Sequence, residues 1–172
     1  MSLQTQPPPL DWPHYGIGFG DAISRAIKKY ARFDGRASRG EYWWWTLFIT
    51  LVLTVIGVLA LVIGVQTSPD GGETPGAPAV PLLVVLGLFY LAILVPTIAL
   101  TVRRVHDAGY SGWLVLLALI PSVGGLILLV FTVLPSSPAG AKYGPPIPYP
   151  PAQYPPSQYP PAQYPPNQYP PA

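Results

Sequence analysis

Three long apolar segments alternate with short polar ones along this chain. They run from Tyr42 to Val65, from Val80 to Val102 and from Trp113 to Leu134, and none contains Asp, Glu, Lys, Arg or His. Each segment has 22 to 24 residues. A helix rising about 1.5 Å per residue is then long enough to cross a hydrocarbon core of roughly 30 Å. The pattern predicts an all-α integral membrane protein with spans at about 42–65, 80–102 and 113–134.

The third segment is interrupted at its middle, from Pro121 to Gly125, and this leaves two arrangements open. A single kinked helix would cross the membrane once. A helical hairpin would have halves of about seven and nine residues, roughly 10–14 Å long and too short to cross separately. It would re-enter among the other helices. Length favours the single span, Lys142 favours the hairpin, and the side on which the C-terminal tail lies stays open.

A segment before the first span, from Asp21 to Phe33, has a helical period. At roughly 100° per residue, its apolar side chains share one face and its basic side chains share the other. The apolar face comprises Ile23, Ala26, Ile27, Tyr30 and Phe33, and the basic face comprises Arg25, Lys28, Lys29 and Arg32. With Asp21 as N-cap, we expect a short amphipathic helix in the headgroup region, with a solvated helix packed elsewhere as the alternative.

The first span has a start signal of its own. Ser38 is followed three residues later by Glu41, the spacing of a capping box, so the helix is expected to begin at about Arg39. Aromatic rings with a polar edge favour the membrane interface. The residues expected to serve as interfacial anchors are Tyr42, Trp43, Trp44, Trp45 and, at the third segment, Trp113.

The C-terminal end repeats Pro-Pro-X-Gln-Tyr every five residues from Pro150 onward. No apolar face can form, and proline removes backbone donors, so a disordered tail biased to polyproline II is expected. The chain therefore divides into a disordered N-terminus (1–15), a helical membrane domain (16–144) and this Pro/Tyr/Gln-rich tail (145–172). Multivalent weak binding of a partner and a simple spacer role remain alternatives for the tail.

Composition and charge placement narrow the class of protein. Only 9% of the 172 residues are charged, and there is no cysteine; soluble domains usually reach about 25% charged. The lack of cysteine excludes disulfides, thiol nucleophiles and Cys-ligated metals, and we expect no metal or cofactor. Six basic residues precede the first span, the loop from Gln66 to Ala79 has none, and the second loop has two. The positive-inside rule then predicts a multi-pass protein with a cytoplasmic N-terminus.

The densest group of functional side chains follows the second span. His106 and Asp107 have the chemistry of an acid–base pair, but adjacent residues on a helix point in different directions. The other histidine, His14, lies far away near the N-terminus, and no hydrolase motif or phosphate loop is present. A structural role is favoured, in which Asp107 pairs with an arginine or caps a turn, and no catalytic site is expected.

Two motifs carry a family resemblance: FDGRASRGEYW at 33–43 and RRVHDAGYSGW at 103–113, separated by two spans. In this order they resemble the domain of unknown function 805 family of small bacterial inner-membrane proteins, over roughly residues 16–144. Val105 stands where leucine is more usual. The family has no assigned activity, so the resemblance implies a fold and a location but no reaction. It also implies a shared cytoplasmic structural or interaction cluster of Arg36, Ser38, Arg39, Glu41, Arg103, Arg104, His106 and Asp107.

These features favour a non-enzymatic membrane scaffold or interaction protein. Its basic cytoplasmic collar is expected to bind anionic lipid headgroups or an acidic partner, and its tail an unknown membrane or cytoplasmic protein. Homo-oligomers are compatible with the pattern, and nucleic acid is not expected as a partner. The alternatives are a transporter or channel subunit and a lipid-acting enzyme at the interface. The lack of charge inside the spans counts against an ion path.

Overall fold

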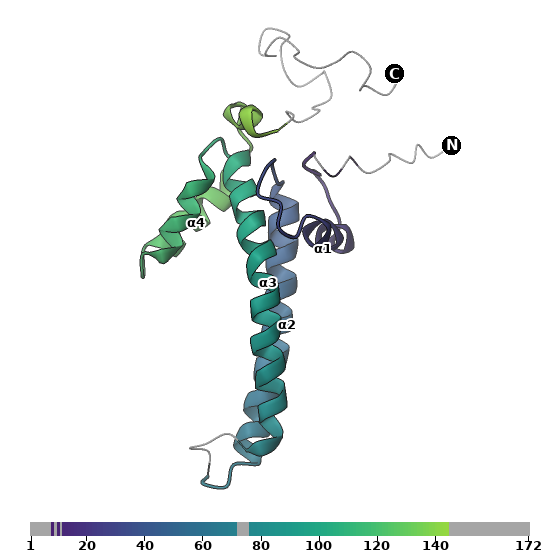
Figure 1. Ribbon diagram of the computed structural model, residues 1–172, viewed down its shortest axis with the longest axis vertical. Coiled ribbons are helices and arrows are strands. Elements are labelled where there is room, and N and C mark those ends of the chain that lie inside the picture. The colour runs from purple at the N-terminus through teal and green to yellow at the C-terminus, as the bar shows by residue number, and fades with distance from the viewer. Residues whose placement is uncertain (1–7, 9, 11, 72–75, 145–172) are drawn as a thin grey trace, which may run out of the picture.

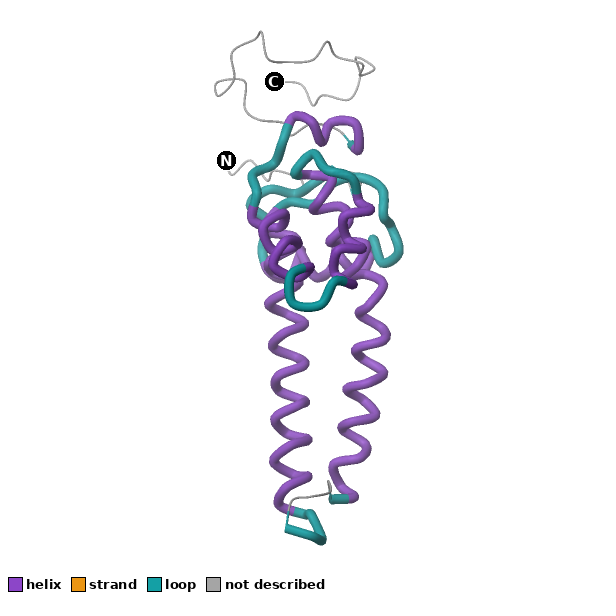
Figure 2. The backbone as a smooth tube through the Cα atoms, turned by 90° about the vertical axis from the view of Figure 1, so that its left-hand side faces the viewer, coloured by secondary structure: helices purple, strands orange, loops and turns teal. Residues whose placement is uncertain are grey.

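The structure is a computed structural model that describes residues 8, 10, 12–71 and 76–144, and two long helices dominate it. Helix α2 (Arg39–Gln66) and helix α3 (Val80–Asp107) each have 28 residues. They run antiparallel, side by side (Figures 1 and 2), and the short 3-10 helix η1 (Ala77–Ala79) precedes α3. We call this pair the stalk.

The remaining elements gather at the end of the stalk where α2 begins and α3 ends (Figures 1 and 2). They are α1 (Phe19–Lys28), the 3-10 helix η2 (Gly112–Leu119), α4 (Gly124–Val133) and the 3-10 helix η3 (Pro138–Tyr143). We call this end the head. The described residues contain helices and turns but no strand, which agrees with the predicted all-helical class.

The first stalk helix starts as the sequence predicts. The Ser38 hydroxyl oxygen accepts a hydrogen bond from the Glu41 backbone N–H at 3.1 Å, and the Glu41 carboxylate accepts one from the Ser38 N–H at 2.8 Å. This capping box satisfies two backbone donors at once, and α2 begins at Arg39. Helix α3, by contrast, continues five residues past the predicted end at Val102, so the charged residues up to Asp107 belong to the helix.

The third apolar segment does not form the single span that its length favoured. It folds into a hairpin of η2 and α4, packed against each other and joined by a turn at Ile120–Val123 (Figure 1). The chain turns away from α3 after Asp107 and comes back to this residue, since the Ser137 N–H donates to the Asp107 carbonyl oxygen at 2.8 Å. Pro121, which lacks an N–H, lies in this turn, and Ser122 adopts φ 69°. The hairpin alternative is therefore the one formed.

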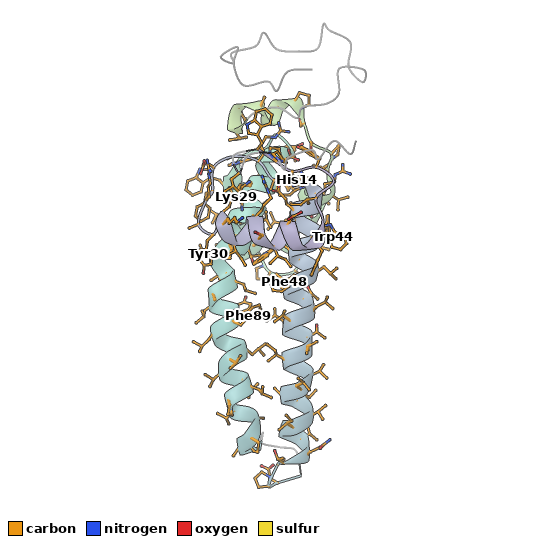
Figure 3. All side chains as sticks on the ribbon, turned by 90° about the vertical axis from the view of Figure 1, so that its right-hand side faces the viewer. His14, Lys29, Tyr30, Trp44, Phe48 and Phe89 are labelled. Atoms are coloured by element: carbon orange, nitrogen blue, oxygen red, sulfur yellow. The ribbon has the colours of Figure 1, made fainter. Side chains whose placement is uncertain are left out.

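Helix α1 is shorter than predicted, and part of its basic face is buried. It begins after Gly18, so Asp21 lies inside the helix instead of capping it. Arg25 and Lys29, expected on an outward basic face, are 7% and 4% exposed, whereas Ile27 is 55% exposed. Figure 3 shows α1 lying across the stalk near Trp44 and Phe48. Arg25 and Lys29 point inward because they meet the carboxylate of Glu41 on α2, whereas Lys28 of the same face stays exposed.

The aromatic residues divide into outward and inward groups. Trp43, Trp44 and Trp113 are 40%, 38% and 79% exposed, as anchors would be. Trp45 is only 2% exposed and donates its indole N–H to the Thr97 hydroxyl at 3.1 Å. It belongs to the apolar core between the stalk helices and α1, so its assignment as an interfacial anchor is wrong. Tyr42 is half-buried, with its ring edge-on to Trp43. The predicted tail, and most of the N-terminal segment up to Asp11, lie outside the described residues.

Candidate functional site

A single buried carboxylate, that of Asp107, joins four parts of the head. Its Oδ1 accepts hydrogen bonds from Arg36 Nε and from the Tyr15 hydroxyl, both at 2.9 Å. Its Oδ2 accepts one from the Ser136 hydroxyl at 2.5 Å and one from Arg104 Nη1. Asp107 and Arg104 are fully buried and Arg36 is 1% exposed. We call these five residues the Asp107 cluster.

The two guanidinium groups of the Asp107 cluster have further partners. Arg104 donates through Nε to the Thr132 carbonyl oxygen at 3.0 Å and through Nη2 to that of Leu134. Arg36 donates to the Ser137 carbonyl oxygen at 3.1 Å. These bonds tie the returning arm of the hairpin to α3 and to the loop that precedes α2. Burial raises the pKa of the Tyr15 phenol, so this hydroxyl stays protonated and donates to the carboxylate.

A second buried carboxylate, that of Glu41, holds α1 against α2. Glu41 is 2% exposed, and its Oε1 lies 2.8 Å from Arg25 Nε and 3.9 Å from Lys29 Nζ. Burial lowers the pKa of Lys29 to about 8, a shift that the neighbouring Glu41 charge opposes. Arg25 also donates to the Trp12 carbonyl oxygen at 2.5 Å, which draws the N-terminal segment over the head. We call Arg25, Lys29, Ser38 and Glu41 the Glu41 cluster.

Arg103 is buried but incompletely paired. It is 1% exposed, and its Nε reaches only the Ala99 carbonyl oxygen of its own helix, at 3.3 Å. Its Nη2 is buried with no hydrogen-bond partner among the described residues. A buried N–H donor that lacks a hydrogen-bond partner destabilises the folded state. Arg103 therefore differs from its neighbour Arg104, which forms hydrogen bonds through Nε and both Nη atoms.

Arg103→Met should leave the free energy of unfolding unchanged within about 1 kcal/mol, or raise it, because an apolar residue of similar length replaces an under-bonded buried charge. Thermal unfolding of the detergent-purified protein measures this. Glu41 keeps Arg25 and Lys29 as partners in this variant. A loss of several kcal/mol would contradict this assessment and show that Arg103 has a stabilising partner.

His106 is engaged away from Asp107. Its Nδ1 lies 3.2 Å from the Gly35 carbonyl oxygen, and its ring stacks on Tyr143 with centroids 3.8 Å apart and planes 8° from parallel. Gly140 allows this docking of η3, since a Cβ there would lie 2.6 Å from the His106 carbonyl oxygen. His106 and Asp107 thus make separate structural contacts, and the described residues hold no group of three or more His, Asp or Glu side chains able to bind a metal.

The predicted cluster is therefore divided among several environments. Arg36, Arg104 and Asp107 meet in the Asp107 cluster, Ser38 and Glu41 in the Glu41 cluster, and Arg39 is exposed at the head surface. Sequence reasoning missed Tyr15 and Ser136, two hydroxyl donors to Asp107. Neither lies in a periodic or charged pattern that could have indicated its role.

Two adjoining cavities open beside the Asp107 cluster. One, of about 330 Å³, is lined by Tyr15, Gly16, Ser38, Arg39, Gly40, Pro135 and Ser136. The other, of about 430 Å³, is apolar and is lined by Leu129, Val130, Val133, Leu134 and Pro135. Pro135 borders both, so the cavity at the start of α2, which we call the polar cavity, lies next to the apolar groove along α4.

Comparison with known proteins identifies a family and relatives that are named as inner membrane proteins. Residues 30–145 match the family model described as "Protein of unknown function (DUF805)". The chain is 36% identical over 118 residues to "Inner membrane protein YhaI" of Escherichia coli (strain K12), covering 69% of this chain and 87% of that protein. It is 33% identical over 125 residues to "Inner membrane protein YhaH" of the same strain, covering 73% and 94%. No solved structure matches the chain.

Proposed function

This chain belongs to the family described as "Protein of unknown function (DUF805)", and from that premise we propose that it is a multi-pass inner-membrane protein acting as a non-enzymatic scaffold. The stalk helices support the spanning role. Each is long and apolar enough to cross a bilayer, yet only 11% and 17% of their most apolar stretches are buried within the protein. Water would make such exposure unfavourable, whereas lipid chains would cover it.

One observation carries the proposed orientation: all nine Lys and Arg residues belong to the head or to the stalk ends that form it. The hairpin brings Lys142 to this end, beside Tyr143 and near His106, and the loop at the opposite end has no basic residue. Because basic residues concentrate on the cytoplasmic side, we propose a cytoplasmic head. Residue 144, which leads into the repeat tail, then lies on the cytoplasmic side too, where the tail would recruit a partner.

Single cysteines in this cysteine-free chain test the orientation. In intact cells an impermeant thiol reagent should label Asp70→Cys, at the far end of the stalk. Asp34→Cys and Ala139→Cys should be labelled only after the membrane is permeabilised, because one lies before α2 and the other after the hairpin, both in the head. All three positions are exposed, so accessibility reports the side of the membrane.

Two outcomes would contradict different parts of the proposal. Labelling of Asp34→Cys in intact cells would reverse the orientation. Labelling of Ala139→Cys in intact cells, with Asp34→Cys still protected, would mean that the third apolar segment crosses the membrane in cells. Residue 139 would then lie on the side opposite to the one that we propose.

The scaffold role is supported by how the ionisable groups of the head are used. Asp107 and Glu41 are both buried in ion pairs, and His106 is stacked on Tyr143. This arrangement stiffens the head and presents outward basic residues such as Lys28 and Arg39. Anionic headgroups or an acidic partner would be attracted to them, on the order of 1 kcal/mol for each.

A further inference from the structure

We propose that the polar cavity beside Arg39 and the apolar groove on α4 together bind one anionic phospholipid molecule of the cytoplasmic leaflet. Its phosphate would lie against Arg39, and one acyl chain would follow the groove. The inference rests on the proposed membrane orientation and adds to it a specific ligand site.

The polar cavity has the charge expected for a phosphate site. Arg39 is its one charged lining residue, and the lining contains no acid. Two buried acids lie behind the lining, and each is paired with basic side chains. Asp107 accepts from Tyr15 and Ser136 and pairs with two arginines. Glu41 accepts from the Ser38 N–H and pairs with Arg25 and Lys29. A guanidinium group recognises a phosphate through charge-assisted hydrogen bonds. The cavity is thus complementary to an anion.

The side chain of Arg39 stands where the two cavities meet. Its Nε donates a hydrogen bond to the Leu134 carbonyl oxygen at 3.1 Å. Arg39 lines the polar cavity, Leu134 lines the apolar groove, and Pro135 borders both. This bond fixes the guanidinium group at the junction, where the phosphate of an amphiphile would lie while its chain extends along α4.

The groove explains why a phospholipid fits better than free phosphate. Its side chains are apolar and outward, with Leu129, Val130 and Val133 being 47%, 59% and 53% exposed. Helix α4, which carries this face, extends beside the stalk and diverges from it (Figure 1). In the proposed orientation it enters the cytoplasmic leaflet, so the groove meets acyl chains and the polar cavity lies at headgroup depth.

Native mass spectrometry of the full-length protein in detergent, with added phosphatidylglycerol or phosphatidylcholine, tests the site. The wild-type protein should retain one phosphatidylglycerol and far less phosphatidylcholine. Arg39→Gln should weaken phosphatidylglycerol binding about tenfold, the usual effect of losing a charge-assisted hydrogen bond. Val130→Trp should fill the groove and weaken both lipids. Lys142→Gln and Leu126→Trp, which are exposed positions outside the two cavities, should bind as the wild type does.

Equal retention of phosphatidylglycerol by Arg39→Gln and Lys142→Gln would overturn the inference. Full displacement of the lipid by millimolar inorganic phosphate would also overturn it, because that would indicate a free-phosphate site. Circular dichroism of each variant shows whether it is folded. The cysteine labelling separates this result from the proposed function: unchanged labelling with no lipid site removes only the inference, whereas Asp34→Cys labelled from outside removes the orientation on which it rests.

Discussion

Asp107→Ala should yield little folded protein, with a loss of about 3–5 kcal/mol in the free energy of unfolding, the usual effect of removing one partner from a buried ion pair. Two guanidinium groups would remain in the interior of the head without their carboxylate, and two hydroxyl donors would lose their acceptor. The amount of protein recovered from membranes, and thermal unfolding in detergent, measure the loss. Arg104→Met should behave similarly, because it leaves the same carboxylate underpaired.

One acid variant and one histidine variant serve as controls for Asp107→Ala. Asp34 is exposed and pairs with Arg32 at 3.1 Å; exposed pairs contribute only about 0–1 kcal/mol, so Asp34→Ala should be nearly neutral. His106→Gln should also leave the protein largely stable. If Asp107→Ala is as stable as Asp34→Ala, the Asp107 cluster does not hold the head together. A stable His106→Gln variant that loses its biological effect would favour the interfacial enzyme.

The sequence predicted those features that local signals determine. Ser38 and Glu41 are three residues apart, and their capping box depends on that spacing alone, so the start of α2 agreed with its prediction. The long uncharged segments likewise predicted the two stalk helices. The inward turn of Arg25 and Lys29 was not predictable in this way, because it depends on Glu41, a residue of another helix. Periodicity identifies two faces of a helix but not which face is buried.

The hairpin, too, could not be predicted from local sequence patterns. Residues 113–134 have the length and composition of a span, and their two halves are equally apolar. What decides the fold is where the far end of the segment is held. The Leu134 carbonyl oxygen accepts hydrogen bonds from Arg39 and Arg104, and Ser136 donates to Asp107. These contacts join residues 29 to 95 positions apart in the chain, and no local pattern reveals them.

Gly124→Ala should open the hairpin. A Cβ at this position would lie 1.7 Å from the Leu117 carbonyl oxygen, a backbone atom that a rotamer change cannot move away. The turn between η2 and α4 would have to shift by more than an ångström, and we expect a loss of at least about 3 kcal/mol, at the upper end of overpacking effects. Thr132, which is fully buried on α4, provides the measurement. In the Thr132→Cys background, a membrane-permeant thiol reagent should react roughly tenfold faster or more once Gly124 is replaced, because the protected position becomes accessible.

Gly125→Ala is the matched control, one residue along the same helix. A Cβ at Gly125 would meet nothing within 4 Å, and alanine favours a helix over glycine by about 0.8–1.0 kcal/mol. This variant should keep the slow labelling of Thr132→Cys and unfold at the same temperature as the parent or a higher one. If both alanine variants react at the same rate, the close contact between Gly124 and Leu117 does not hold the hairpin. If only Gly124→Ala reacts faster, the return of the chain to the head depends on Gly124, a position at which no side chain fits.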